Sequence, residues 1–528
     1  MTAPLLGQWS AEVRIVNAES GGQVACRVRL TDAAGHEVVP RGHAQSLAGE
    51  AQEGDVSFQA HRYCYTNGAF AVDPARLPLR YRILKGYEYE MAEGELTSRE
   101  LARGPATVGL KRWSSLAARG WYSGDIHIHH IAPQSCHLEM DAEDLNVANI
   151  LTSDFTTDQH LFEGRLNRHS RGNRLIYVNQ EFRNHELGHL CLLNLKKLIE
   201  PVKSVQEHHH PLHLRVCDEA RRQGGYVSWA HFPSWPGVES PVDVALDKLD
   251  GLEILSVLDP RELPIFMKHV VPEWEANNGL RLWYRYLNCG YRLAATAGTD
   301  KMTTFVTVGA NRVYARLDGE FTYENWIAAL RAGRTFITNS PILHFTVSGR
   351  EPGAEIRLDA GGSATVEIEA AAESQLPYDR LEIVSNGAVV ADASPSGRRH
   401  SARIRVEHPI NGSCWLAARV REELGPYRAK GIDFKTAHSA KGTVLSDYYG
   451  TRRPETVFAH TSPVYVLVDG RPIRNWEDAQ YYVRYVDSSI RWLDKEAKFA
   501  RPADKKASID AFLRARAVWE ERARQARA

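Results

Sequence analysis

The sequence lacks the marks of several protein classes. Its seven cysteines are scattered without a CxxC pair, and an odd number without a framework indicates free thiols rather than a disulfide scaffold. Basic and acidic residues number 65 each, so the formal net charge is zero and indicates neither a nucleic-acid nor an anionic-membrane partner. No window approaches the roughly eighteen uninterrupted apolar residues of a membrane span, so none is expected.

The N-terminal stretch "MTAPLLGQWSAEVRIVN" has neither a basic region nor a long apolar run, so no signal peptide is expected. We therefore expect a cytoplasmic protein, although a periplasmic or secreted form without its leader would read the same. The chain has 528 residues, of which 43% are hydrophobic and 25% charged, as in folded globular proteins. This length exceeds a single ordinary core and predicts roughly two to four domains.

Residues 1–118 are predicted to form a β-sandwich accessory domain. The stretches "AEVRIV", "VACRVRLTD" and "YRILKGYEYEMAEGEL" alternate apolar and polar residues. Such alternation is typical of strands with one buried face.

Residues 119–340 show a different pattern of predicted secondary structure. Short apolar strands such as "NRLIYVNQEF" and "GGYVSWAHF" alternate with helical stretches such as "PLHLRVCDEARRQGG". This order predicts βα units and a largely parallel sheet or barrel, an α/β fold. In such folds the reacting groups lie at the C-terminal ends of the strands.

The last third of the chain returns to strands and then to helices. Residues 341–472, with "ATVEIEA", "DRLEIVSNGAVVA" and "SPVYVLVDG", predict a second β-sandwich domain. Residues 473–528 are amphipathic and predict a helical C-terminal segment.

The stretch "GDIHIHH", residues 124–130, places three histidines within four positions. In a strand, residues i and i+2 point to the same face, so His127 and His129 would project side by side and could hold one metal ion. His130 would point the other way. Taken alone, such a pair is better explained as an ordinary surface or hydrogen-bonded pair, so its interpretation depends on the other strand ends.

Four further polar residues lie at predicted strand ends. Glu181 ends "LIYVNQEF", His189 opens the next strand, His231 ends "GGYVSWAHF" and Asp300 ends "YRLAATAGTD". A buried carboxylate or imidazole is costly unless it is paired or bound to metal. Together with the histidine pair, these residues predict a metal centre.

The ligand types predict two divalent ions bridged by Glu181. Nitrogen and oxygen ligands without thiolate suit zinc or manganese, with iron as the alternative. Two ions about 3.5–4 Å apart would lower the pKa of a bridging water and polarise the substrate oxygen.

Several segments resemble one family of hydrolases. They are "WYSGDIHIHH", "AEDLNV", "QEFRNHELGHL", "WYRYLNCGYRLAATAGTD", "NRVYARLDGEFTYENWIAALRAGRTFITNSPIL" and "AHTSPVYV". In this order they resemble the carbaryl-hydrolase-like (CehA/McbA) metallohydrolases, a branch of the polymerase and histidinol phosphatase (PHP) superfamily, from about residue 85 to 520. The resemblance implies a distorted (β/α)7 barrel between the two sandwiches and hydrolysis of ester or phosphoester bonds.

The same resemblance implies how the ligands divide. His127, His129, Glu181 and Asp300 would hold the first ion, and Glu181, His189 and His231 the second.

The chain departs from the family pattern at two positions. Phe155 follows Asp154, and Met302 lies two residues after Asp300, where relatives commonly have histidines for a third ion. Their loss predicts a dinuclear site and counts against phosphatase activity.

Beyond Glu181 and Asp300, two further residues are candidates for catalysis. His130 and Arg183 could protonate a leaving group or hold an anion. Asp154 fits either a group that orients a ligand histidine or a helix N-cap. The histidines of "EHHHPLHL", which include His209 and His213, are interpreted as a solvated cluster.

The sequence thus predicts a metal-dependent hydrolase that cleaves a small-molecule ester, first of all a carbamate or carboxylic ester. One alternative is a PHP-type phosphoesterase. Another, of a different class, is a non-catalytic metal-containing protein that binds carbohydrate or protein. Assembly as a homo-oligomer is left open.

Overall fold

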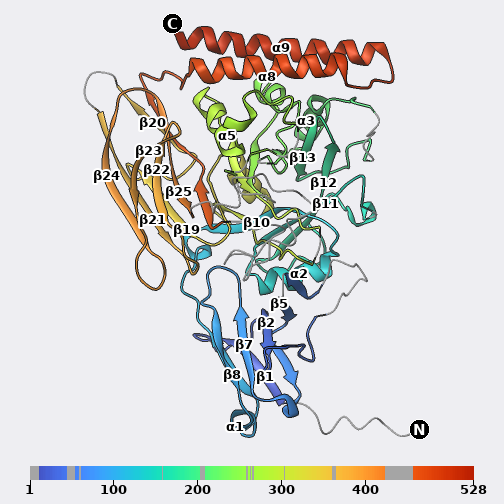
Figure 1. Ribbon diagram of the computed structural model, residues 1–528, viewed down its shortest axis with the longest axis vertical. Helices are drawn as coiled ribbons and strands as arrows, with labels where there is room; N and C mark the ends of the chain where they lie inside the picture. The colour runs from blue at the N-terminus through green and yellow to red at the C-terminus, as the bar shows by residue number, and fades with distance from the viewer. Residues whose placement is uncertain are drawn as a thin grey trace.

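The computed structural model describes residues 11–527, except 45–53, 59–60, 157, 203–207, 233, 257–259, 262, 265–266, 303, 360–363 and 423–455. The molecule is elongated (Figure 1): N-terminal strands, in blue, lie at one end and a pair of long helices, in red, at the other. A large mixed sheet lies between them.

The N-terminal strands form two sheets around one small core. Alternation in β1 buries Val13 and Ile15 and exposes Arg14 between them, as the sequence pattern predicts. The core also takes Val28 and Ile83 from the second sheet. The first sheet has the order β6 (Ala69–Val72), β1 (Ala11–Asn17) and β9 (Ala106–Leu110). The second has the order β4 (Val56–Phe58), β5 (His61–Thr66), β2 (Cys26–Thr31), β7 (Leu79–Leu84) and β8 (Ala92–Leu96), with β3 (Glu37–Val38) beside β2.

The large sheet carries the strands that end near the predicted metal ligands. Its order begins β16 (Ala294–Ala297), β15 (Gly251–Leu255), β14 (Tyr226–Trp229), β13 (Gly188–Leu193), β12 (Leu175–Asn184), β11 (Val147–Thr152), β10 (Trp121–Ile128), β17 (Arg312–Arg316) and β18 (Thr335–Thr338). The ladders β10–β11–β12 and β14–β15–β16 are parallel, whereas β13 runs antiparallel to both of its neighbours. Strands β11, β12 and β13 are buried almost throughout, as expected for a sheet covered on both faces.

This sheet does not close into the predicted (β/α)7 barrel within the described part of the chain. Residues Trp121–Gly124 of β10 pair with β17, which continues the sheet outward instead of closing it. Only beyond this ladder does β10 approach the other end of the sheet, through one bridge between Ile128 and Lys301 and a hydrogen bond of 3.0 Å from His129 N to Lys301 O. The fold is therefore a mixed α/β arrangement with an open sheet.

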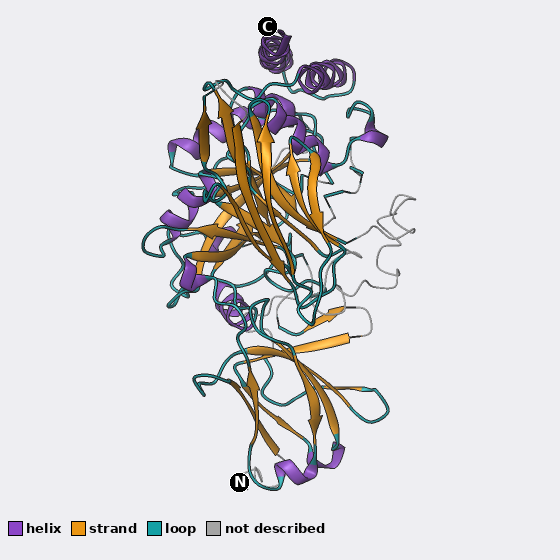
Figure 2. Ribbon diagram, turned by 90° about the vertical axis from the view of Figure 1, so that its left-hand side faces the viewer, coloured by secondary structure: helices purple, strands orange, loops and turns teal. Residues whose placement is uncertain are grey.

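Helices lie along the outside of the strands (Figure 2). Their apolar faces contribute to the core that fills the space against the sheet, with Val216, Leu282 and Trp326 among the buried residues. The helices of this region are α2 (Pro133–Ala142), α3 (His213–Arg222), α4 (Ser240–Ala245), α5 (Gly279–Asn288) and α6 (Tyr323–Arg331).

The strands after residue 341 form a two-layer arrangement. Ile368, Ile383 and Leu416 pack between the layers. One layer consists of β19 (Ile342–Val347), β21 (Ala364–Glu373) and β24 (Ala402–Ile410). The other consists of β20 (Glu355–Leu358), β22 (Arg380–Ser385), β23 (Ala388–Ala393), β25 (Cys414–Arg421), β26 (Phe458–Thr461) and β27 (Val464–Val468). This second layer joins the large sheet because β26 pairs with β18. The predicted boundaries at 118, 340 and 472 stay predictions.

The predicted helical C-terminal segment forms the pair α8 (Trp476–Lys495) and α9 (Pro502–Arg527). Trp519 of α9 stacks on Tyr482 of α8 at 4.6 Å and donates a hydrogen bond of 2.9 Å to Pro241 O. These contacts hold the pair against the helices that flank the sheet (Figure 1). Among the helices of the described residues, none has the length and apolarity to cross a membrane.

Candidate metal centre

Six predicted ligands meet in one buried cluster at the strand ends. His127 lies in β10 and His129 just after it, Glu181 lies in β12, and His189 lies in β13. The other two, His231 and Asp300, follow β14 and β16. Because these strands are neighbours in one curled sheet, residues far apart in the chain come within a few ångströms of each other.

The first part of the cluster surrounds the two histidines of "GDIHIHH". The Nε2 atoms of His127 and His129 lie 3.0 Å apart. Asp300 Oδ1 lies 3.5 Å from the former and 3.7 Å from the latter. Glu181 Oε2 lies 3.3 Å from His129 Nε2. We call these four residues, His127, His129, Glu181 and Asp300, the first group.

The second part of the cluster shares Glu181 with the first. Glu181 Oε1 lies 3.1 Å from His189 Nδ1 and 3.6 Å from His231 Nε2. The two imidazole nitrogens lie 3.0 Å from each other. These three residues form the second group. Glu181 Oε1 also lies 3.7 Å from His127 Nε2 of the first group, so this carboxylate lies between the two groups.

The residues of both groups fit divalent cations. With metal–nitrogen bonds of about 2.0–2.1 Å, two ligands of a tetrahedral ion lie about 3.4 Å apart, within the range of the separations above. His127, His129, Glu181 and His189 are almost completely buried, at 0–2% exposure. His127 Nε2 faces His129 Nε2, and His189 Nδ1 faces His231 Nε2. In the tautomers that carry the hydrogen on the other ring nitrogen, these facing atoms have lone pairs that a cation can accept. His127, His129 and Glu181, and likewise Glu181, His189 and His231, have the spacing of a metal site.

The charge states of two ligands suit this role. Burial lowers the pKa of His189 to about 3, so its imidazole is neutral near pH 7. Burial opposes ionisation of Glu181, but the charge of Arg183 and hydrogen bonds from His129 and His189 hold its pKa well below the usual range. A neutral imidazole and an ionised carboxylate are the forms that bind metal.

Arg183 and His130 lie at the edge of the first group. The Arg183 side chain is 19% exposed, and its Nε lies 3.6 Å from Glu181 Oε2. Its guanidinium lies over the ring of Phe155, whose centroid is also 5.4 Å from that of His130. Asp154, for which helix capping was one prediction, lies instead 3.6 Å from Arg183 Nη1 and caps no described helix.

An aromatic side chain borders the second group. The ring of Trp235 lies 4.3 Å from that of His189 and 5.9 Å from that of His231. It also stacks, with an interplanar angle of 2°, on His185 at 5.7 Å. Phe155 therefore borders the first group and Trp235 the second.

Three residues of this region have left-handed backbone conformations. His130 has φ of 53°, His231 of 32° and Asp300 of 44°. Residues without glycine's freedom keep such conformations only where surrounding contacts enforce them, and they concentrate at functional sites.

One supporting residue could have been found in the sequence. Asp125 of "GDIHIHH" accepts hydrogen bonds from His127 N, from Gly309 N and from both the backbone and the hydroxyl of Thr299. Because Thr299 precedes Asp300, this carboxyl ties the histidine strand to the Asp300 segment. Its burial raises its pKa to about 6.

Two other supporting residues gave no signal in the sequence. Glu253 lies in the apolar stretch "LDGLEILSV" and Cys191 in "GHLCLLNL", and both contact His127 Nδ1, at 3.1 and 3.5 Å. With His127 they also have the spacing of a metal site. One more such group, among the N-terminal strands, consists of His43, Asp55 and Cys64.

The interpretation of "EHHHPLHL" as a solvated cluster is wrong for two of its histidines. His209 is buried and lies 3.1 Å from Glu186 Oε2, and it accepts a hydrogen bond from Lys498 N near the C-terminal helices. His213 is buried in α3, 3.4 Å from Asp243 Oδ2. Tertiary contacts with segments before and after the loop supply these partners, so the local sequence of the loop does not reveal them.

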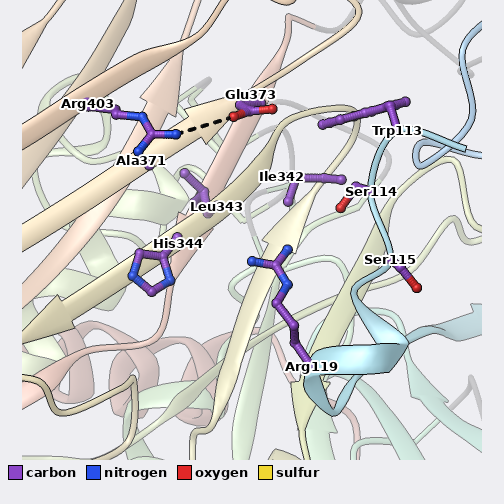
Figure 3. A pocket seen from close by; sticks show the side chains of 10 residues that line it. All are labelled: Trp113, Ser114, Ser115, Arg119, Ile342, Leu343, His344, Ala371, Glu373 and Arg403. Carbon is purple, nitrogen blue, oxygen red and sulfur yellow. Dashed lines mark ion pairs between the residues drawn. The ribbon is translucent and has the colours of Figure 1, made fainter.

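A surface pocket of about 460 Å³ lies elsewhere (Figure 3). It opens between the segment that precedes β10 and the strands β19, β21 and β24, and the ion pair of Arg403 and Glu373 lies at its edge. None of the six predicted ligands lines it.

Comparisons with known proteins add little. No protein-family model and no curated protein matches the chain. Among solved structures, the chain is similar to PsfC from Pseudomonas syringae PB-5123, with a TM-score of 0.28 and 15% identity over 40% of this chain and 90% of PsfC. A likeness this distant carries no argument, so the proposal below rests on the cluster itself.

Proposed function

We propose that the chain is a metal-dependent hydrolase of the carbaryl-hydrolase-like branch of the PHP superfamily, and that it cleaves an ester at a centre of two divalent ions. The observation that carries this proposal is the position of Glu181. Its Oε2 lies 3.3 Å from His129 Nε2, and its Oε1 lies 3.1–3.7 Å from His189, His231 and His127, so its carboxylate contacts imidazoles of both groups. A carboxylate between two metal-compatible groups is the arrangement expected of a bridging ligand.

Zinc or manganese fits the nitrogen and oxygen donors, with iron as the alternative. The chemistry that such a pair supplies is the activation of water and the polarisation of a carbonyl oxygen. The protein's own part is to hold the donors in place and to shield them from bulk solvent.

Asp300 is the ligand nearest the solvent. Its side chain is 13% exposed, against 8% for His231 and 3% or less for the other four. In this proposal Asp300 accepts the proton of the attacking water, because it combines contact with the first group with access to substrate. His130, beside the same group, protonates the leaving group.

The flanking aromatic rings support an ester with an aryl group. Phe155 and Trp235 border the two groups, and their faces offer stacking partners for an aromatic leaving group. An aryl carbamate or aryl carboxylic ester is therefore the first substrate class to test.

One observation favours a second candidate, a phosphoesterase. Arg183 places a partly exposed guanidinium 3.6 Å from Glu181 Oε2. A fixed cation beside the centre would suit a substrate with a negative charge, such as a phosphodiester.

The test combines metal analysis with a substrate panel. We expect about two equivalents of zinc or manganese per chain by inductively coupled plasma mass spectrometry, and loss of most of that metal in Glu181→Ala. Metal-loaded protein should hydrolyse nitrophenyl carbamates or carboxylates, and treatment with chelator should abolish the activity.

The matched control is Glu239→Gln, which alters a fully buried carboxyl outside the centre. It should keep its metal and its activity. One equivalent or less in the wild type, or metal unaffected by Glu181→Ala, would contradict the bridged centre. Two equivalents without hydrolysis of any ester in the panel would favour a binding protein.

A further inference from the structure

Glu253 is a buried carboxylate that contacts both groups of the metal centre. It lies in the middle of β15 and is 0% exposed. Its Oε2 lies 3.1 Å from His127 Nδ1 and also accepts a hydrogen bond from His231 N. One oxygen atom therefore reaches a ligand of the first group and a ligand of the second.

The contact with His127 fixes which ring nitrogen faces the ligands. When Nδ1 carries the hydrogen and donates it to Glu253, Nε2 keeps its lone pair. That Nε2 is the atom that lies 3.0 Å from His129 Nε2 and 3.5 Å from Asp300 Oδ1. Glu253 thus selects the tautomer and the ring orientation that metal binding requires.

The contact with His231 acts on the backbone. His231 has φ of 32°, a conformation that its neighbours must enforce. The side chain of Glu253 accepts from His231 N, and the main-chain oxygen of Glu253 accepts from Phe232 N at 3.2 Å. Two consecutive peptide groups are therefore tied to one residue of β15, which directs the His231 ring toward Glu181.

The surroundings leave the carboxylate little room to move. A Cβ atom at Gly298 would lie 2.5 Å from Glu253 Oε1 and 2.6 Å from His127 Cβ. Only a residue without a side chain fits there, so the chain packs directly against the pair. This close packing holds the Glu253 carboxylate and the His127 ring in fixed positions relative to each other.

We propose that Glu253 is a positioning residue that orients one ligand of each metal ion, His127 through its ring and His231 through its backbone. This inference rests on the proposed two-ion centre. It predicts that one substitution at a residue outside both groups weakens the binding of both ions.

The test measures zinc affinity by competition with a chromogenic chelator in the full-length protein. Loss of an outer hydrogen-bonding partner typically lowers metal affinity about 10- to 100-fold, and we expect such a loss at both sites in Glu253→Ala. Glu253→Gln keeps an acceptor oxygen at the same reach and should bind zinc more tightly than Glu253→Asp. Glu253→Asp keeps the charge but is one methylene shorter, and this order separates positioning from charge alone.

Cys191→Ser is the matched control, because Cys191 also contacts His127 Nδ1, at 3.5 Å. It should bind both ions within about twofold of the wild type, since Glu253 still contacts His127 Nδ1 and still accepts from His231 N in this variant. The visible spectrum of cobalt-substituted protein gives a second readout, and it should change in Glu253→Asp and stay near that of the wild type in Cys191→Ser. If Glu253→Ala does not fold, the Gln and Asp variants carry the test.

Several outcomes would overturn the inference. Wild-type affinity at both sites in Glu253→Asp and Glu253→Ala would do so, as would an equal loss in Cys191→Ser. A third zinc ion lost from both Cys191→Ser and Glu253→Ala, with two retained, would show that Glu253 is itself a ligand. In all of these the wild type still binds two ions, whereas a wild type with fewer than two contradicts the proposed function as well.

Discussion

The guanidinium of Arg183 lies over the ring of Phe155, 4.4 Å from its centroid, and its Nε lies 3.6 Å from Glu181 Oε2. The stacking holds a positive charge beside the proposed metal bridge. At 19% exposure this side chain can still meet a substrate. In the proposed enzyme, this pair would place a positive charge where a substrate can reach the centre.

Arg183→Met should discriminate between substrates by charge. Removing a charge-assisted hydrogen bond costs about 1.5–3 kcal/mol, so kcat/KM for an ester with an added carboxylate should fall about 10- to 100-fold. The neutral ester should lose much less. Arg183→Lys keeps the charge without the planar fork and should lie between these values. Equal losses for both esters would argue against contact between Arg183 and the substrate.

The candidate ligands at the strand ends could be predicted from the sequence, because each is a polar residue next to an apolar run. The period of two in "GDIHIHH" predicts that His127 and His129 share a face, and the structure places their Nε2 atoms 3.0 Å apart. The α/β class was likewise predictable from strands that alternate with helices. Whether these residues bind metal stays a prediction.

Other features depend on contacts that no local pattern records. The open sheet follows from the pairing of β10 with β17, a ladder between distant segments. Glu253 occupies an apolar stretch, and its contacts are with His127 in β10 and with His231 just after β14, both far from it in the sequence. His209 is buried because the C-terminal helices cover it.

Trp235→Ala should weaken the recognition of aryl groups. Stacking of aromatic rings contributes about 0.5–1.5 kcal/mol beyond burial, so KM for an aryl ester should rise about 2- to 10-fold. KM for an alkyl ester of the same acid should change less. Because Trp235 contacts His189, the metal content must be measured in parallel and should remain that of the wild type. Trp235→Phe should restore most of the affinity, and a parallel rise for alkyl esters would refute the stacking role.

Glu239→Gln should make stability less dependent on pH. Burial, together with the nearby charge of Asp243, raises the pKa of Glu239 to about 8. The pKa of Glu239 is therefore higher in the folded protein than in the unfolded chain. The protonated carboxyl contributes its full share to the free energy of unfolding below about pH 4, and this share is lost as the pH rises through about 8.

Between pH 6 and pH 9 the free energy of unfolding of the wild type should therefore fall by up to about 3 kcal/mol, and that of Glu239→Gln should not show this fall. Urea unfolding of metal-free protein at both pH values measures the difference. Glu239 accepts hydrogen bonds from the backbone of His213 and Leu214, and a glutamine oxygen can accept them as well, so the fold should persist. An identical pH dependence in the two proteins would show that Glu239 is already ionised at pH 6.

Removal of metal should destabilise the central sheet. A ligand that binds only the folded state stabilises it by about 2.7 kcal/mol at a concentration 100 times Kd. The two groups draw their residues from β10, β12 and β13 and from the ends of β14 and β16, so bound ions would crosslink five strands of the sheet. Zinc should therefore raise the midpoint of thermal unfolding relative to protein in chelator. The increase should vanish in Glu181→Gln and persist in Glu239→Gln, because only the former removes a donor shared by both groups. An increase of equal size in all three proteins would place the stabilising metal outside the centre, for which His43, Asp55 and Cys64 are the group to examine.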